Sequence, residues 1–260
     1  MIPLKDNIPT DRTPWVTLAL ILANVVVYLL EIRHGGNFWS GPSASTTVHY
    51  GLIPYELTHP GKHCDLINAG QIACEGQRGV TGHAPSQPST VETLFAAMFM
   101  HGGIVHLAGN MIFLWVFGNN VEDAMGPVRY VVFYLLGGLA ATGLQVLVSP
   151  DSTVPNIGAS GAIAAVLGGY LVIYPRARVL TLLFLIIFFT FIELPALLFL
   201  FIWFAEQVVF GLVNLTDPTG GGGGVAYFAH VGGFLFGALA IRVFATRIKR
   251  DYLQPKYPVY

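Results

Sequence analysis

Two polar residues stand at the start of long apolar runs in this sequence. Ser160 lies in the tetrapeptide Gly-Ala-Ser-Gly at residues 158–161, and His230 precedes an apolar run that ends at Phe244. Polar side chains inside membrane segments are costly and usually serve a function. A serine hydroxyl is a poor nucleophile without a base, and His230 is the one histidine in the C-terminal half of the chain. The pair indicates nucleophilic catalysis. The alternatives are that Ser160 caps a helix and that His230 is an interfacial histidine.

A second polar group precedes this pair along the chain. His106 and Asn110 are four residues apart and therefore share one helix face. Both can donate hydrogen bonds to the oxyanion that forms during acyl transfer. His101 is five residues before His106, so we expect it to point elsewhere, nearer the surface, in a supporting role or as an exposed interfacial histidine. A His101–His106 metal pair lacks a third ligand, and we expect no metal site.

Small residues allow the helices that carry Ser160 and His230 to approach each other. Gly233 and Gly237 form a small-xxx-small pattern, and Gly161, Ala165 and other small residues follow Ser160. This pattern lets helix backbones come close together. Close approach is what a Ser–His hydrogen bond requires.

The composition is that of a polytopic integral membrane protein. Of the 260 residues, 54% are hydrophobic and 10% are charged, compared with about 25% charged in soluble domains. The mean hydropathy is +0.63. The net charge of −1 gives no indication of a nucleic-acid partner. The fold class that we expect is all-α, a bundle of transmembrane helices in a lipid bilayer.

Six membrane spans are predicted, each near the ~20 residues that cross the hydrocarbon. They are about Trp15–Ile32, Thr93–Phe117, Val128–Val148, Ser160–Tyr174, Leu194–Val213 and Val225–Ala245. Glu193 and Pro195 interrupt the apolar run from Val179 to Val213. We therefore expect residues 179–190 to approach the membrane as an interfacial or re-entrant segment. Two spans in this run would make seven.

The distribution of Lys and Arg predicts that both termini are cytoplasmic. With six spans, most basic residues fall on the side of the termini, including the tail at residues 246–260. A seventh span would move that tail outside. In the six-span arrangement the N-terminal ends of the second, fourth and sixth spans all lie on the outer side. Every candidate catalytic group is then in the outer half of the membrane.

The first outer loop, residues 34–92, is long and polar and holds both cysteines, Cys64 and Cys74. An extracytoplasmic location permits a disulfide between them. Two free thiols are the alternative, and a metal site with His63 and His83 fits no standard zinc spacing. Two other features each have two interpretations. The glycine run Gly220–Gly224 is either a flexible linker or a lid over Ser160, and Trp203 is either lipid-facing or part of a gate.

The motifs in this order resemble the rhomboid intramembrane serine proteases. The matching segments are His101 to Asn110, Gly158 to Gly161 and Ala229 to Gly237, and the stretch from Glu122 to Tyr130 looks like the family's turn. The resemblance covers about residues 93–245, the core of a single domain that spans 1–260. It extends loosely to the first span.

The resemblance implies a Ser160–His230 dyad without an acidic third member. It also implies an oxyanion hole from His106, Asn110 and the Ser160 amide, with Gly158 beside the nucleophile, and it implies no metal and no cofactor. Its substrates are transmembrane proteins cut near the outer end of their helix. Some members have an aromatic residue four positions after the serine that stacks on the histidine. Here that position is Ala164, so another group must orient the imidazole.

Two other functions are weighed against the protease. One is a non-proteolytic rhomboid-like chaperone or adaptor that binds transmembrane helices, whose members typically lack the serine or the histidine. The other is a transporter, for which polar groups should gather at the midplane instead of at one end. The plain N-terminus favours a prokaryotic plasma membrane. The natural substrate and the oligomeric state have no signal in the sequence.

Overall fold

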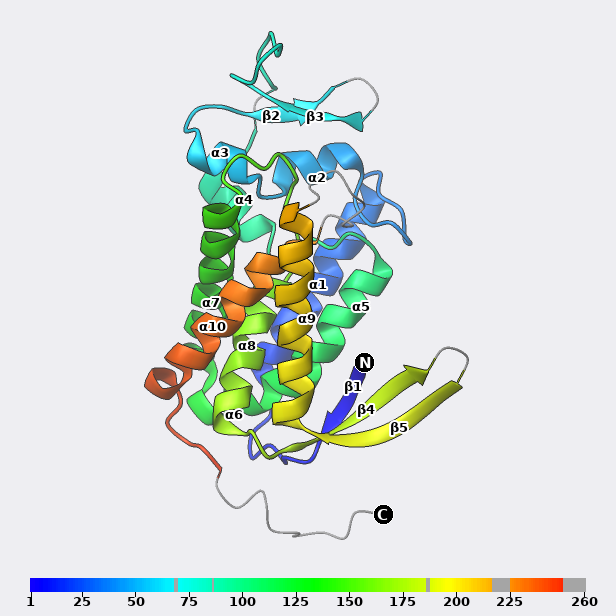
Figure 1. Cartoon of the computed structure of the whole chain (residues 1–260), viewed down its shortest axis with the longest axis vertical. Coiled ribbons are helices and arrows are strands. Elements are labelled where there is room, and N and C mark those ends of the chain that lie inside the picture. Colours follow the sequence, from blue (N-terminus) through cyan, green and yellow to red (C-terminus); the bar gives the residue numbers. More distant parts are fainter. Residues whose placement is uncertain (68–69, 86, 186–187, 217–224, 250–260) are drawn as a thin grey trace.

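A computed structural model describes residues 1–67, 70–85, 87–185, 188–216 and 225–249 of the chain. The described part is mostly helical, with two small sheets at opposite ends of a helical bundle (Figure 1). The elements are β1 Ile2–Asp6, α1 Trp15–Arg33, α2 Ala44–Tyr50, α3 Pro54–Thr58, β2 Cys64–Leu66, β3 Ile72–Cys74, α4 Thr90–Ala96, α5 Ile104–Phe113, the π-helical turn η2 Leu114–Gly118, α6 Asn119–Met125, α7 Pro127–Val148, α8 Ser160–Ile173, β4 Arg178–Leu185, β5 Phe188–Pro195, α9 Ala196–Thr216 and α10 Tyr227–Phe244. The expectation of an all-α chain is therefore wrong for these strands.

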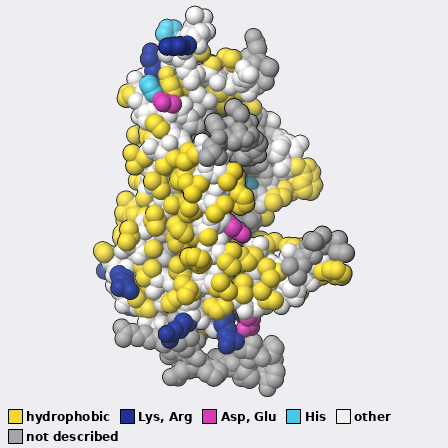
Figure 2. Space-filling view, viewed as in Figure 1, with side chains coloured by type: hydrophobic (Ala, Val, Ile, Leu, Met, Phe, Trp, Pro, Cys, Tyr) yellow, Lys and Arg dark blue, Asp and Glu magenta, His cyan; other side chains and the backbone are white. Residues whose placement is uncertain are grey.

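Five helical stretches among the described residues are long and apolar enough to cross a membrane. They are Trp15–Arg33, Ile104–Met125, Pro127–Val148, Ala196–Leu215 and Tyr227–Phe244. On the face that Figure 2 shows, hydrophobic side chains cover the middle of the bundle, and Lys and Arg side chains gather at its lower end and at the far upper end. The arrangement is that of a polytopic membrane protein. The sixth span and the cytoplasmic location of the termini stay predictions.

The second span differs from its predicted bounds. Instead of one helix over 93–117, α4 ends at Ala96, and a new helix starts at Ile104 and continues through η2 and α6 to Met125. Gly103 causes the break, because its φ of +141° lies in a region that L side chains rarely adopt. A side chain there would also meet the carbonyl oxygen of Trp39. The break places His106 in the first turn of α5.

Helix α8 is the centre of the bundle. With 14 residues it is shorter than the five helical stretches above, and most of its residues from Gly161 to Ile173 are buried. It packs against α10 with backbones in contact. A Cβ added to Gly233 would lie 2.0 Å from the oxygen of Gly161, and one added to Gly237 would lie 1.8 Å from that of Ala165. The glycines thus produce the close approach that their spacing predicts.

The segment after α8 forms a β-hairpin, a conformation that its apolar sequence did not indicate; its expected place at the membrane interface stays a prediction. Strands β4 and β5 pair antiparallel from Arg178↔Pro195 to Leu185↔Phe188, and β1 at the start of the chain pairs with β4. The hairpin extends sideways from the bundle beside β1 (Figure 1). Its residues are β-branched or aromatic at many positions, which favours strands. Period and length did not distinguish such a strand from a short apolar helix.

Buried polar contacts join α1 to α6, and β1 to α6 and α8, at one end of the bundle. The Glu122 carboxylate of α6 accepts hydrogen bonds from the Val16 amide (3.0 Å) and from the amide and hydroxyl of Thr17 (both 2.8 Å). It therefore caps the N-terminus of α1. Asp6 in β1 accepts from Asn120 and Tyr170, and its burial raises the pKa of its carboxyl to about 6.

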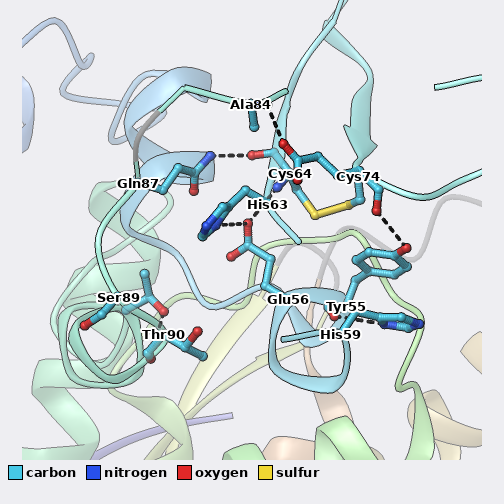
Figure 3. A network of polar contacts seen from close by, with 12 residues as sticks. Tyr55, Glu56, His59, His63, Cys64, Cys74, Ala84, Gln87, Ser89 and Thr90 are labelled. Atoms are coloured by element: carbon cyan, nitrogen blue, oxygen red, sulfur yellow. Dashed lines mark hydrogen bonds and ion pairs between the residues drawn. A yellow bond between two sulfur atoms is a disulfide. The ribbon is translucent and has the colours of Figure 1, made fainter. Parts of the chain in front are cut away.

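The loop at residues 34–92 contains a small disulfide-bonded cap. Cys64 and Cys74 are joined by a disulfide across the β2–β3 pair, and both are fully buried. Figure 3 shows Glu56 beneath this bridge, with its carboxylate accepting from the Cys64 amide at 2.7 Å. Burial raises the pKa of Glu56, against the effect of that hydrogen bond and of His63. The cap lies at the end of the bundle opposite the β1–β4–β5 sheet (Figure 1).

Candidate active site

Ser160 and His230 meet at the same end of the bundle, near the N-termini of α8 and α10. The Ser160 Oγ lies 2.8 Å from the Nε2 of His230, and both side chains are half-buried. Ser160 is the first residue of α8, and Ala159 is in the capping position. No side chain of the described residues caps α8, so Ser160 does not act as the helix cap that was the alternative for it. The hydroxyl and the imidazole are within the distance required for proton transfer.

The other ring nitrogen of His230 binds a residue that the sequence analysis did not assign to the site. The Nδ1 of His230 is 2.8 Å from the Oε1 of Gln207 on α9. The Nε2 of Gln207 in turn donates to the carbonyl of Trp203, one turn earlier on α9, at 3.2 Å. The amide oxygen can only accept, so His230 donates from Nδ1 and presents the lone pair of Nε2 to Ser160. The available signal was an amide in an otherwise apolar span.

The hydrogen bond to Gln207 orients the His230 ring, for which Ala164 provides no aromatic partner. Ala164 is buried in α8 and offers no ring to the imidazole. The indole of Trp203 instead lies near His230, with ring centroids 5.9 Å apart and planes inclined at 35°. Both orienting groups therefore come from α9.

His106 is held so that one of its ring nitrogens lies on the same side of Gly158 as the Ser160 hydroxyl. The Gly102 amide donates to the Nδ1 of His106 at 3.2 Å, which leaves the proton of a neutral ring on Nε2. That Nε2 lies 3.0 Å from the position of a Cβ on Gly158, and the Ser160 Oγ lies 3.5 Å from the same point. The imidazole and the hydroxyl thus both lie near this point. His106 is placed to donate to an oxyanion formed at Ser160.

Gly158 is required by its backbone and by its neighbours. Its φ is +130°, and its amide donates to the Ala97 carbonyl at 2.8 Å. A methyl group there would press on the His106 ring from 3.0 Å. The glycine thus shapes the approach to Ser160.

Asn110 lies one turn after His106 on α5. Its Nδ2 is buried and has no hydrogen-bond partner among the described residues. A buried donor without a partner is costly in a folded protein and often marks a place for a ligand. The amide is consistent with a second side-chain donor at the site.

His101 contradicts one expectation. It is completely buried, not near the surface, and its ring packs edge-on against His106 with centroids 5.0 Å apart. Its Nδ1 is 3.2 Å from the Phe99 carbonyl. His101 lies in the break between α4 and α5, so the two histidines do not share one helix. His101 supports the position of the His106 ring.

A cleft opens beside Ser160 between α4, α7 and α10. Its lining is mainly small and apolar, including Met98, Gly138, Ile157 and Ala229. Among the described residues, no group of three or more His, Cys, Asp or Glu side chains is placed to hold a metal ion. Neither cysteine lines this cleft, since both lie in the disulfide-bonded cap at β2 and β3. The glycine run at 220–224 and the end of the basic tail, residues 250–260, are outside the described residues.

Comparison with known proteins identifies the family. A family model described as the Rhomboid domain matches residues 88–247. The chain belongs to the rhomboid family. RHOMBOID-like protein 6, mitochondrial, of Arabidopsis thaliana is 27% identical over 241 residues, which cover 90% of this chain and 69% of that protein.

Other rhomboid relatives are longer than the region they share with this chain. RHOMBOID-like protein 1 of Arabidopsis thaliana is 24% identical over 94% of this chain and 56% of its own length. Presenilin-associated rhomboid-like protein A, mitochondrial, of Danio rerio is 27% identical over 80% of this chain and 51% of its own length. Two of these three names carry the word mitochondrial, so they give no support to the expected prokaryotic plasma membrane.

Proposed function

We propose that this rhomboid is an intramembrane serine endopeptidase that cuts transmembrane proteins near the outer face of the membrane. The observation that carries the proposal is the 2.8 Å contact between the Ser160 Oγ and the His230 Nε2, made by residues of two different helices. A hydroxyl and an imidazole at this distance form an activated nucleophile. The one-sided location of the pair favours this function over a transporter.

The reaction would follow the usual acyl-transfer course. Ser160 attacks the scissile carbonyl while His230 takes its proton at Nε2. The tetrahedral oxyanion is stabilised by the Nε2–H of His106, the Nδ2 of Asn110 and the first backbone amides of α8, whose dipole adds a positive end. His230 then gives the proton to the leaving amine, and a water hydrolyses the acyl-enzyme by the same route in reverse.

The site also indicates which part of the substrate is cut. Carbonyl groups in a transmembrane helix are hydrogen-bonded, so the substrate must unwind locally before Ser160 can attack. Helix-breaking residues near the cut lower that cost. The cleft beside Ser160 is apolar and holds only about 50 Å³, which favours small side chains at the scissile bond.

The test is a comparison of Ser160→Ala with the wild type. In proteoliposomes with a reporter transmembrane substrate, the wild type should cleave the substrate and react with a fluorophosphonate probe. Ser160→Ala should do neither while unfolding at the same temperature. The exposed Ser45 on α2 provides a matched control, since Ser45→Ala should leave both activities intact. Binding of the substrate without cleavage or labelling in the wild type would favour the non-proteolytic chaperone or adaptor.

A further inference from the structure

The hydrogen bond between His230 and Gln207 gives the site a third member. We propose that Gln207 is a positioning residue that holds His230 in the tautomer and orientation needed for base catalysis, in a Ser160–His230–Gln207 chain. The inference rests on the proposed function, because it concerns how the same site is prepared for catalysis. It assigns to α9 a part in the chemistry, since the serine, the histidine and the amide lie on α8, α10 and α9.

The geometry fixes the direction of every proton in this chain. The Oε1 of Gln207 accepts from Nδ1 of His230 at 2.8 Å, and its Nε2 donates to the Trp203 carbonyl at 3.2 Å. If the amide were turned over, its oxygen would face the Trp203 carbonyl and two acceptors would be in contact. The Trp203 carbonyl therefore selects the rotamer of Gln207, and Gln207 selects the tautomer of His230. Nε2 of His230 is left as the acceptor for Ser160.

Burial explains why this bond is kept. Gln207 is 8% exposed on a helix whose other faces are largely apolar. An amide placed there without partners would lose its hydrogen bonds to water and gain nothing. Both of its polar atoms are instead used, one on its own helix and one on the imidazole. The adjacent Glu206 is exposed and serves as a comparison at the same depth.

A neutral amide differs from the carboxylate of the usual serine-protease triad. It orients the imidazole and accepts its Nδ1 proton, but it adds no negative charge beside the imidazolium that forms in the transition state. Its contribution is therefore to geometry and tautomer. Loss of such an orienting bond costs roughly 10- to 100-fold at metal-bound histidines and about 10⁴-fold in the protease triad.

The experiment compares three variants of the full-length protein in proteoliposomes. Gln207→Met keeps the length of the side chain and removes the acceptor, Gln207→Glu keeps an oxygen acceptor, and Glu206→Leu is the control. We expect Gln207→Met to lower kcat at least tenfold with KM within about twofold. Gln207→Glu should recover most of that loss, and Glu206→Leu should match the wild type.

A spectroscopic readout separates positioning from a general structural role. In protein labelled with ¹⁵N-histidine, the His230 signal, assigned by its loss in His230→Ala, should show a protonated Nδ1 and an unprotonated Nε2. In Gln207→Met it should shift to a mixture of tautomers. Unchanged kcat in Gln207→Met, or an equal loss in Gln207→Glu, would overturn the inference. If the wild type cleaves nothing, the proposed function fails, and the tautomer signal still decides the position of the Gln207 bond.

Discussion

Replacing Gly233 with Ala should separate the two helices that hold the catalytic pair. The new Cβ would lie 2.0 Å from the Gly161 carbonyl oxygen, directly beside Ser160. Carbon–oxygen contacts in proteins settle at about 3.3 Å or more. Because the obstacle is backbone and not a flexible side chain, α8 and α10 must move apart by roughly 1 Å.

That displacement acts on the hydrogen bond at the centre of the site. The Ser160 Oγ and His230 Nε2 are 2.8 Å apart, so an added ~1 Å places them beyond hydrogen-bond range. A misplacement of this size costs about 10²-fold in rate. Overpacking at a helix contact should also lower the free energy of unfolding by about 1–3 kcal/mol.

The assay is cleavage of a transmembrane reporter in proteoliposomes, together with the rate of fluorophosphonate labelling and the unfolding midpoint in detergent. The matched control is Gly143→Ala on α7, where a new Cβ meets nothing within 4 Å. That variant should retain wild-type rates. If Gly233→Ala cleaved and labelled as fast as the wild type, the backbone contact of α8 and α10 would not be what places the serine against the histidine.

Three further predictions concern the site and the two ends of the bundle. Gly158→Ala should lower kcat at least tenfold, since its methyl group would displace the His106 ring, and should also lower stability because of the φ of +130°; a normal rate of reporter cleavage would contradict this. The pKa of Asp6 is raised to about 6 from 3.8, so its contribution to the free energy of unfolding is full below pH 3.8 and is lost as the pH rises to 6, by up to ~3 kcal/mol. The free energy of unfolding should therefore fall over this pH range in the wild type and not in Asp6→Asn, and parallel curves would refute the prediction. Glu122→Ala should destabilise the protein by about 1–3 kcal/mol by leaving the start of α1 uncapped, which thermal unfolding measures against an exposed Glu206→Ala control.

The sequence was informative where a polar residue interrupted an apolar run. Ser160, His106 and His230 were candidates because their types are rare in such segments, and the structure brings the three close together. The glycines at 233 and 237 predicted how two helices would meet. The helical spans followed from length and hydropathy. These signals are local, and each can be evaluated without knowing which elements become neighbours.

The sequence did not indicate which helices and strands become neighbours in the fold. Gln207 is an ordinary amide until α9 is known to lie against α10, and His101 is buried in a break between α4 and α5 that the apolar run did not indicate. The hairpin after α8 has the same apolar composition as a short membrane helix. Its pairing with residues 2–6 is a contact between distant parts of the chain, which no local periodicity records.

The junction between β5 and α9 makes the position of Gln207 sensitive to the tilt of α9. Strand β5 ends at Pro195 and α9 begins at Ala196, which is fully buried and whose amide bonds the Ala177 carbonyl. Gln207 is eleven residues further on, roughly 16 Å along the helix axis. A tilt of α9 by only ~10° about this fixed foot would carry the amide almost 3 Å sideways, a distance over which no hydrogen bond survives. If α9 tilted outward to admit a substrate helix, the Gln207–His230 hydrogen bond would be lost. His230 would regain its orientation only when α9 returned.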